Sequence, residues 1–191
     1  MGRYNWWQEN LELEVDRGQF KSWLEDSDFS SRQKTFDLVL KSGAKSVLEI
    51  GPGTFIDYKH FYKHQDDIEY QAVDFTQKVV DYSQTLGAFC KLGSIEDIPH
   101  EDNSFDFVYC RHVLEHLADY KTAIQEMVRV SKKCICLALW MMEEKEAKLS
   151  FNGVLHHNSY VKSEVIEFME NQNLEVEFYQ MNNDKVLLGE K

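Results

Sequence analysis

Residues 46–55 read SVLEIGPGTF, an apolar run that carries one carboxylate and ends in a glycine-rich turn. Turns of this kind often bind phosphate, because their backbone N–H groups are accessible and a helix N-terminus follows. A dinucleotide-binding fingerprint, however, requires a third glycine where Ile56 stands, and a P-loop requires Gly-Lys followed by Ser or Thr. Glu49 would also repel a pyrophosphate in a site of low dielectric constant. The stretch therefore predicts a ligand without phosphate at this point and favours one that carries a cation.

The sequence beyond this turn alternates between strand and helix patterns. Short apolar runs predict buried strands, and apolar residues spaced by three and four predict helices between them. Five such units indicate an α/β protein with a doubly wound, parallel sheet and helices on both faces. Two alternating runs joined by Met181-Asn182-Asn183-Asp184 predict a C-terminal β-hairpin. We expect strands at 47–50, 68–73, 88–92, 105–110 and 134–140, helices at 56–64, 76–86, 120–130 and 162–170, and hairpin strands at 174–179 and 185–188.

The composition argues against several classes of protein. The chain has 191 residues, which fits one domain, and a formal net charge of −12. This negative charge, without a Lys/Arg cluster longer than a pair, argues against a nucleic-acid partner. No apolar run approaches the roughly 18 residues of a membrane span, and the acidic N-terminal stretch lacks the apolar core of a signal peptide. We therefore expect a cytoplasmic protein without membrane contact, with four reduced core cysteines: Cys90, Cys110, Cys134 and Cys136.

Two segments outside the strand–helix units are expected near the ligand. Ligands of parallel sheets bind beyond the carboxyl ends of the strands. Residues 1–45 are helical in pattern and rich in aromatic residues, including Trp6 and Trp7. We predict that they form an N-terminal helical segment and candidate lid, joined to a ligand-binding domain at residues 46–191 within one structural domain. The polar connection at residues 141–161 is expected at the same edge of the sheet.

Four segments in order and at matching spacing resemble the class I S-adenosylmethionine-dependent methyltransferases, in their small-molecule branch. The resemblance covers residues 45–140, about half of the chain, and is specific because the motifs occur together. It implies a Rossmann-like seven-stranded sheet, mostly parallel, with an antiparallel strand from the C-terminal hairpin. The matching segments are VLEIGPGTF at 47–55, QAVD at 71–74, the stretch 93–108 and RHVLEHL at 111–117.

The resemblance implies S-adenosylmethionine as cofactor, S-adenosylhomocysteine as product and transfer of a methyl group to an N, O or C nucleophile of a small molecule. This cofactor carries a sulfonium and an ammonium but no phosphate, in agreement with the turn. By the resemblance, Asp74 accepts both ribose hydroxyls, and Glu49 orients the loop and faces the ammonium. The residues implied to contact the cofactor are Glu49, Gly51, Gly53, Asp74, Phe75, Ser94, Ile95 and Arg111, the last beside the methionine moiety together with Cys110.

Two positions depart from the family pattern. Phe55 stands where the third motif glycine is usual, and Ser94 replaces an aspartate that accepts the adenine amino group. Glu96 is a candidate to compensate for the second change. Both departures motivate an alternative, namely a non-catalytic relative with a vestigial cofactor site that acts as a binding or scaffold protein.

Histidines supply the candidate catalytic residues. His116 and His157 are candidate general bases toward the acceptor, because an unperturbed imidazole titrates near neutral pH. His112 and His116 also form an H-x-x-E-H pattern, which on one helix would bind zinc, but its position among cofactor motifs disfavours a metallopeptidase. A base is needed only for a protonated acceptor, since a sulfonium methyl is already activated and catalysis rests on alignment. The sequence therefore predicts no metal and leaves the acceptor undefined.

Overall fold

The computed structural model describes residues 29–61, 67–140, 142–153 and 155–191. In it, strand β1 (Ser46–Ile50) is an interior strand of a seven-stranded sheet. It pairs in parallel with β2 (Glu69–Asp74) on one side and with β4 (Phe105–Arg111) on the other. Because the chain order reverses between these two neighbours, the carboxyl end of β1 is a topological switch point. The glycine turn therefore lies at the crevice where ligands of such sheets bind.

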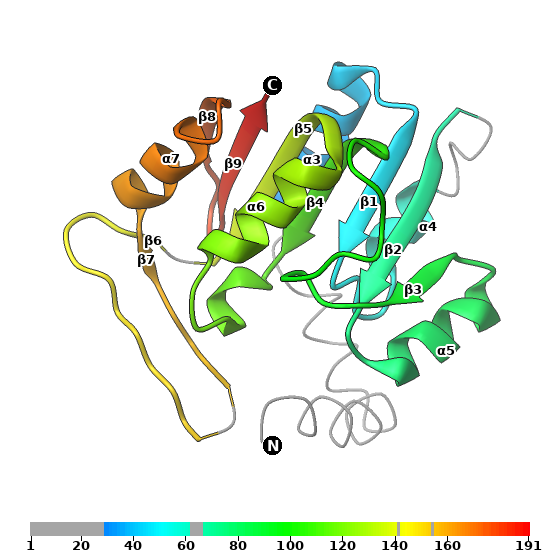
Figure 1. Ribbon diagram of the computed structural model, residues 1–191, viewed down its shortest axis with the longest axis horizontal. Coiled ribbons are helices and arrows are strands. Elements are labelled where there is room, and N and C mark those ends of the chain that lie inside the picture. The colour runs from blue at the N-terminus through cyan, green and yellow to red at the C-terminus, as the bar shows by residue number, and fades with distance from the viewer. Residues whose placement is uncertain (1–28, 62–66, 141, 154) are drawn as a thin grey trace.

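The strand order across the sheet is β3-β2-β1-β4-β5-β9-β8 (Figure 1). Strand β3 (Cys90–Leu92) pairs in parallel with β2, and β5 (Ser131–Leu139) pairs in parallel with β4. The C-terminal β9 (Lys185–Glu190) runs antiparallel between β5 and β8 (Glu175–Gln180). The predicted fold class is confirmed, including the antiparallel strand from the hairpin.

Helices cover both faces of the sheet. Helices α6 (Lys121–Val130) and α7 (Lys162–Glu170) pack on the face that receives Leu48 and Ile50 of β1. Val47 lies in the other cluster, with Leu38 and Val39 of α3. Alternate side chains of a strand point to opposite faces, so Glu49 shares the face of Val47. The short helix α4 (Ile56–Phe61) and helix α5 (Gln77–Leu86) lie on the same face of the sheet as α3 (Phe29–Ser42). Helix α4 is bonded to α3 directly.

The described part of the predicted N-terminal segment is joined to the sheet. In α3, the Ser31 hydroxyl donates to Asp184 in the β8–β9 turn, and Arg32 forms a buried ion pair with Asp57 of α4. The proposed boundary at residue 45 and the lid role remain predictions, since Tyr4, Trp6 and Trp7 lie outside the described residues. Among the residues that are described, no helix has the length and apolar character to cross a bilayer.

Two regions differ from the sequence prediction in detail. On α5, the spacing of three residues from Val79 predicts an inward position for Tyr82, but this side chain is 39% exposed. Ser83 is buried instead, and its hydroxyl donates to the Val80 carbonyl. The polar connection after β5 contains two short strands, β6 (Met142–Glu143) and β7 (Tyr160–Val161), which pair in parallel. Residues 144–159 between them form a projecting arm, apart from residue 154, which lies outside the described residues (Figure 1). Its two sides are bonded, because Lys148 and Ser159 exchange backbone hydrogen bonds of 2.9 and 2.8 Å.

Candidate active site

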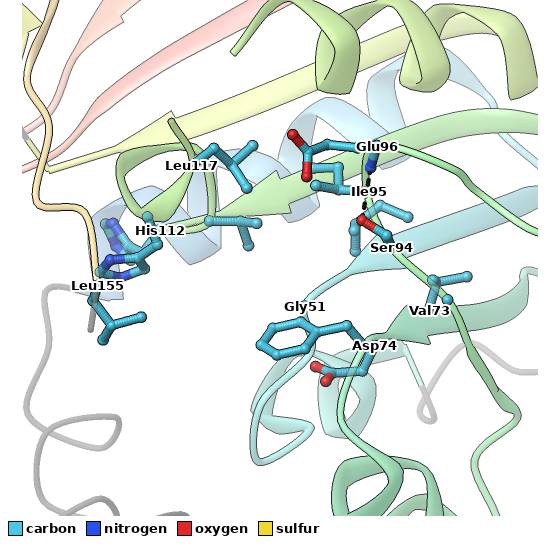
Figure 2. A pocket seen from close by; sticks show the side chains of 14 residues that line it. Gly51, Val73, Asp74, Ser94, Ile95, Glu96, His112, Leu117 and Leu155 are labelled. Carbon is cyan, nitrogen blue, oxygen red and sulfur yellow. Dashed lines mark hydrogen bonds between the residues drawn. The ribbon is translucent and has the colours of Figure 1, made fainter. Parts of the chain in front are cut away.

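A cavity opens at the carboxyl ends of β1, β2 and β4, and we call it the switch-point cavity. It has about 650 Å³ of empty volume, part of which is open to solvent. Its walls come from the strand ends, the segment after β3, the segment after β4 and the arm. Figure 2 shows how its labelled residues surround the space: Gly51 and Asp74, then Ser94, Ile95 and Glu96, and across from these His112, Leu117 and Leu155.

The glycine turn brings bare backbone to this cavity. Gly51 has a φ of +72°, and a Cβ atom added there would lie 2.7 Å from the Cγ2 atom of Val113. Only glycine fits both the left-handed conformation and this close approach. Gly53 also has a positive φ, of +54°, but an added Cβ would meet nothing within 4 Å, and Gly53 does not line the cavity. Gly51 is therefore the position where the absence of a side chain shapes the site.

Phe55 does not fill the switch-point cavity. Its backbone has a φ of +58°, which is the left-handed conformation expected for a motif glycine. Its side chain is fully buried in a separate apolar cluster with Val79 of α5 and Ala72 of β2. The bulk of this residue is thus accommodated behind the loop, where it joins α4 and α5 to the sheet.

Asp74 ends β2 inside the cavity. Its carboxylate accepts the backbone N–H of Thr76 at 2.8 Å, which fixes the side chain at the start of α5. Burial raises the pKa of Asp74 to about 6, opposed by the hydrogen bonds from Thr76. The carboxylate is therefore ionised at neutral pH, when it acts as an acceptor for more than one hydrogen bond. Phe75, the next residue, lies in the same wall.

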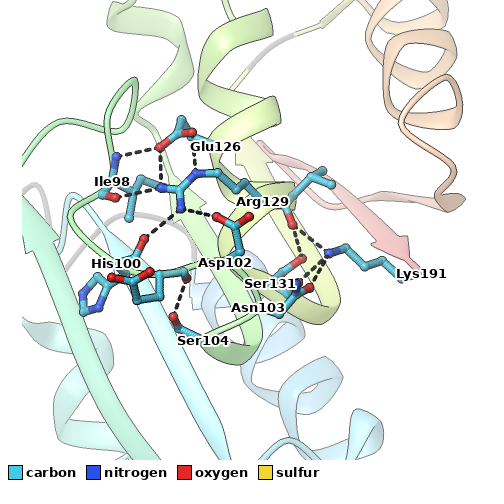
Figure 3. Close-up of polar contacts among 11 residues, drawn as sticks. Ile98, His100, Asp102, Asn103, Ser104, Glu126, Arg129, Ser131 and Lys191 are labelled. Atoms are coloured by element: carbon cyan, nitrogen blue, oxygen red, sulfur yellow. Dashed lines mark hydrogen bonds and ion pairs between the residues drawn. The ribbon is translucent and has the colours of Figure 1, made fainter.

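The segment after β3 carries Ser94, Ile95 and Glu96 to the cavity, and a clamp from α6 fixes it. The Ile98 N–H donates to Glu126 at 2.9 Å, while Arg129 donates to the Ile98 carbonyl at 2.9 Å. The Arg129 guanidinium also forms ion pairs with Glu126 and Asp102 (Figure 3). These bonds fix the backbone at Ile98, which lies two to four residues beyond the three lining residues. A separate bond at 3.1 Å from the Glu96 N–H to the Ser94 hydroxyl holds the turn itself.

Glu49 and Arg111 lie behind the cavity rather than in its wall. Glu49 is buried, accepts a hydrogen bond from Tyr70 and has a pKa raised to about 8 by burial and by Asp57. The Arg111 Nε lies 3.4 Å from Asp57, and the Arg111 side chain is buried. Strand alternation accounts for both positions. Ile50 and its partner Cys110 on β4 face the cavity side of the sheet, so the adjacent residues Glu49 and Arg111 face the other side. Their predicted contacts with a cofactor remain predictions.

His112 lies at the end of β4 between two carboxylates. Its ring nitrogens lie 3.5 Å from Glu115 and 3.4 Å from Asp184, and its ring stacks on Trp140 at a centroid distance of 4.7 Å. Burial acts to lower the pKa of His112, but hydrogen bonds to Asp184 and Glu115 raise it above its ordinary value. The two carboxylates thus favour the protonated form of the His112 imidazole, which lies in the cavity wall.

His116 lies between the switch-point cavity and a second cavity. Its Nδ1 lies 2.9 Å from the carbonyl oxygen of His156 in the arm. A carbonyl only accepts hydrogen bonds, so Nδ1 carries the proton and Nε2 is the basic nitrogen. Burial lowers the pKa of His116, which keeps the ring neutral at pH 7. This tautomer and charge are those required of a general base.

The second cavity, which we call the arm cavity, has about 420 Å³ of empty volume. The ring of His157, the other predicted base, lies 5.6 Å from the ring of His116. The two candidate bases are therefore brought together, but only His116 reaches both cavities. The lining residues of the arm cavity are Glu115, His116, Trp140, His157, Asn158 and Ser159.

The H-x-x-E-H pattern does not form a helical metal site. His112 has a φ of +56°, and only Leu114–His116 form a single 3-10 turn. The two imidazoles bind different partners, namely carboxylates at His112 and a carbonyl at His116. Across the described ranges, no group of three His, Cys, Asp or Glu side chains is arranged to hold a metal ion.

Comparison with known proteins agrees with this site. Residues 48–134 match the family model of the methyltransferase domain. This match covers a little less than half of the chain and identifies that part of it as similar to the methyltransferase domain. The matched range includes the end of β1, strands β2 to β4, the glycine turn, Asp74, the Ser94–Glu96 segment and His116.

Two curated proteins and one solved structure illustrate the likeness of this methyltransferase domain. Ajmaline N-methyltransferase of Rauvolfia serpentina is 32% identical over 46% of the chain and 32% of its own length. The uncharacterized methyltransferase YcgJ of Bacillus subtilis is 31% identical over 46% of the chain and 36% of its own length. The matches thus span about a third of the length of these relatives. Among solved structures, the 1,6-didemethyltoxoflavin N1-methyltransferase of Burkholderia thailandensis has a TM-score of 0.73 at 13% identity, over 96% of the chain and 86% of that protein.

Sequence reasoning did not identify several wall residues of the methyltransferase site. Val113 and Leu117 lie in the RHVLEHL segment, where a signal was available in their position after a strand end. Trp140 directly follows the end of β5, where the same signal was available, whereas Leu155 reaches the site only through the tertiary contacts of the arm, for which the local sequence has no signal. Donor-side residues therefore follow from motif position, whereas the arm residues follow from the fold.

Proposed function

We propose that this domain binds S-adenosylmethionine in the switch-point cavity and transfers its methyl group to an N, O or C nucleophile of a small-molecule acceptor. One observation carries the proposal: Gly51, Asp74, Ser94, Ile95 and His116 line a single cavity at the topological switch point. The acceptor is proposed to enter from the arm cavity, which shares His116 with the first.

The residues present fit the proposed cofactor. The Gly51 backbone forms a cradle that a Cβ atom would fill, since that atom would lie 2.7 Å from Val113. Asp74 supplies an ionised acceptor suited to a pair of ribose hydroxyls, by the logic with which acids bind ribose in related folds. Phe75 and Ile95 add apolar surface for a flat base, and Ser94 adds a hydroxyl. Among the lining residues, His112 is the one whose protonated form is favoured by neighbouring carboxylates, and a carboxylate is complementary to that form.

His116 is proposed to act as the general base. When bound, S-adenosylmethionine supplies an activated methyl group, which passes to the nucleophile while the electron pair of the broken bond remains on sulfur. The His116 Nε2 accepts the proton that the nucleophile loses, and the bond from Nδ1 to the His156 carbonyl holds the ring in the required tautomer. Leu117 and Leu155 exclude water from the same space, which favours aligned transfer.

Calorimetry with S-adenosylhomocysteine tests the donor half of the proposal. We expect binding to the wild-type protein and about 50-fold weaker binding for Asp74→Asn, because a charged acceptor shared by two hydroxyls contributes about 2 kcal/mol or more. Asp81→Asn, an exposed carboxylate on α5, is the control and should leave affinity unchanged. Absence of binding at millimolar ligand, or tighter binding of NAD, would refute the proposal and favour the scaffold or oxidoreductase interpretation.

The remaining parts of the proposal concern the setting of the enzyme. We place it in the cytoplasm, which is supported by four cysteines that are all unpaired and mostly buried. We take residues 46–191 as the methyltransferase domain, with the preceding segment as a candidate lid. A small molecule, and not a nucleic acid, is the proposed partner, in agreement with the net charge of −12. Fractionation of cells and methyl transfer to a metabolite panel with a labelled donor test these points.

A further inference from the structure

His112 and Trp140 form a stacked pair between the two cavities. The His112 side chain lies in the wall of the switch-point cavity, as Figure 2 shows, and Trp140 lines the arm cavity. Their rings are stacked, with 4.7 Å between the centroids and 29° between the planes. The position of the His112 ring therefore affects the walls of both cavities.

The backbone of His112 does not belong to a regular element that would fix its side chain. His112 directly follows β4 with a φ of +56°, and its N–H donates to the Ala138 carbonyl at 2.9 Å. A left-handed conformation is uncommon for a residue with a side chain and persists where the surrounding structure imposes it. The direction of the ring is thus set by its tertiary contacts.

One oxygen of Asp184 supplies such a contact. Asp184 lies in the β8–β9 turn and is 3% exposed. Its Oδ2 atom lies 3.4 Å from Nε2 of His112 and also accepts the hydroxyl hydrogen of Ser31 in α3. A carboxylate oxygen has two lone pairs, so it can accept both groups. The hairpin and α3 are thus joined to the cavity wall through one atom.

The hairpin itself does not require this carboxylate. The β8–β9 turn is closed by a backbone bond of 3.0 Å from the Met181 N–H to the Asp184 carbonyl. Aspartates in turns commonly bond to their own backbone, whereas this side chain is buried and reaches Ser31, 153 positions away. Burial of a carboxylate is costly unless partners bond to it, and the partners here are Ser31 and His112.

We propose that Asp184 is a positioning residue of the proposed methyltransferase site, which holds the His112 ring in the wall of the switch-point cavity, and that Ser31 holds Asp184. The inference rests on the proposed function, in which His112 faces the carboxylate of the methyl donor. Ser31 and Asp184 are not among the lining residues of either cavity and lie outside the matched residues 48–134. They act on the donor only through the ring.

A double-mutant cycle tests whether Asp184 acts through His112. Affinity for S-adenosylhomocysteine is measured by calorimetry on the full chain. We expect Asp184→Ala and His112→Asn each to weaken binding about fivefold or more, the size of one net hydrogen bond. Asparagine tolerates a left-handed backbone, so His112→Asn removes the ring without added strain. In the double variant, loss of Asp184 should add less than about twofold, because no ring remains to be held.

Three further variants separate positioning from general stability. Asp184→Asn keeps an oxygen that can accept both groups, so we expect its affinity to stay within about twofold of wild type. Ser31→Ala removes the support of that oxygen and should weaken binding about threefold. Asn182→Ala changes an exposed residue of the same turn and should have no effect. Thermal unfolding of each variant is recorded alongside.

The ring N–H signal of His112 in NMR spectra gives a readout that needs no ligand. The His112 side chain is 13% exposed, so an Nε2–H group held by Asp184 should exchange slowly with water and give a resolved signal. We expect this signal in the wild type and in Asp184→Asn, and its loss in Asp184→Ala. Its absence from His112→Asn identifies it.

Each outcome supports or overturns the inference. Additive losses in the double variant, Asp184→Asn that behaves like Asp184→Ala, or Asp184→Ala that binds S-adenosylhomocysteine like wild type would each overturn it. If Asp184→Ala does not fold, the same cycle with Ser31→Ala decides, and a loss that persists without the His112 ring would overturn the inference. Absence of binding by wild-type protein would refute the proposed function and this inference with it, whereas intact binding that is insensitive to Asp184 refutes the inference alone.

Discussion

The two cavities on either side of His116 are built in different ways. The switch-point cavity consists mainly of strand ends and short turns, with Gly51, Asp74 and Ser94 each following a strand of the central sheet. The arm cavity depends on residues 157–159, which lie on the returning side of a projecting arm with exposed Leu149 and Phe151. The first is therefore determined by the sheet, and the second by the docking of one peripheral segment.

Because of this difference, we expect the two cavities to differ in their tolerance of amino-acid substitutions. Strand ends are fixed by the whole hydrogen-bonded sheet, and the arm contributes Leu155 alone of its described residues to the lining of the switch-point cavity, so donor binding should be much less sensitive than acceptor binding to changes in the arm. The arm docks through few bonds, mainly those of Asn158 and His116, and can vary without loss of the fold. One fold would thus retain a common donor while the arm selects the acceptor.

The largest effect is expected where the two cavities meet. His116→Gln should lower kcat by about 100-fold, the lower end of the range for loss of a general base. S-adenosylhomocysteine affinity should change less than twofold. In the wild type, kcat should rise with pH through a pKa below the ordinary histidine value, because His116 must be neutral to accept a proton and burial favours the neutral form.

The pH profile is the decisive readout for this residue. The acid limb should be absent in His116→Gln and present in His157→Gln. A retained limb in His116→Gln, or an unchanged kcat, would exclude His116 as the base.

The second-largest effect is expected from a substitution that alters only the switch-point cavity. Gly51→Ala introduces a Cβ 2.7 Å from Val113 and a left-handed backbone conformation that costs about 1–2 kcal/mol for alanine. With overpacking of about 1–3 kcal/mol, we expect roughly 50-fold weaker S-adenosylhomocysteine binding, measured by calorimetry. Gly53→Ala has the same backbone cost without the contact and should lose much less. Equal losses for both variants would remove the role of the Val113 contact.

Damage to the arm alone should change only the acceptor. Asn158→Ala removes the bonds to Ser150, Leu117 and Tyr160. We expect the acceptor KM to rise about tenfold, as for three neutral hydrogen bonds at the low end of about 0.5–1.5 kcal/mol each. The donor affinity should stay within twofold. Glu146→Ala, at an exposed position of the same arm, is the control. A donor affinity that falls in parallel would show that the two cavities are not independent.

The smallest effect is expected at the α6 clamp. Arg129→Lys keeps the charge but removes the planar fork that binds Ile98, Glu126 and Asp102. The Ser94–Glu96 segment should then loosen and weaken S-adenosylhomocysteine binding about fivefold, or about 1 kcal/mol. The acceptor KM should not change. Lys133→Ala, which removes an ion pair to Asp106 elsewhere on the surface, should affect neither quantity.

The same contrast explains what the sequence could reveal. The strands, the hairpin and the positions of Asp74, Ser94 and Ile95 follow from local patterns, because parallel strands bring their carboxyl ends to one edge. The placement of Glu49 was also accessible, since alternation along β1 puts it opposite Ile50. The predicted contact of Glu49 with a cofactor rests on its place in the motif and stays a prediction.

The acceptor side was not accessible in this way. Asn158 bonds to Leu117 across 41 positions, and the His116 tautomer depends on a carbonyl 40 positions away. The unusual backbone of His112 and its two carboxylate partners likewise come from β4, the turn after β4 and the β8–β9 turn. Local periodicity has no signal for such long-range pairings, so these side chains emerge only from the folded chain.

The place of β9 has a consequence for biosynthesis. This strand lies inside the sheet, bonded to β5 on one side and β8 on the other, although it follows every other element along the chain. A nascent chain stalled before residue 185 would thus expose the apolar β5 as an open edge prone to misassociation. Ribosome arrest-force profiling should accordingly register the cooperative folding event only after Glu190 has left the exit tunnel, and an earlier event would contradict this order.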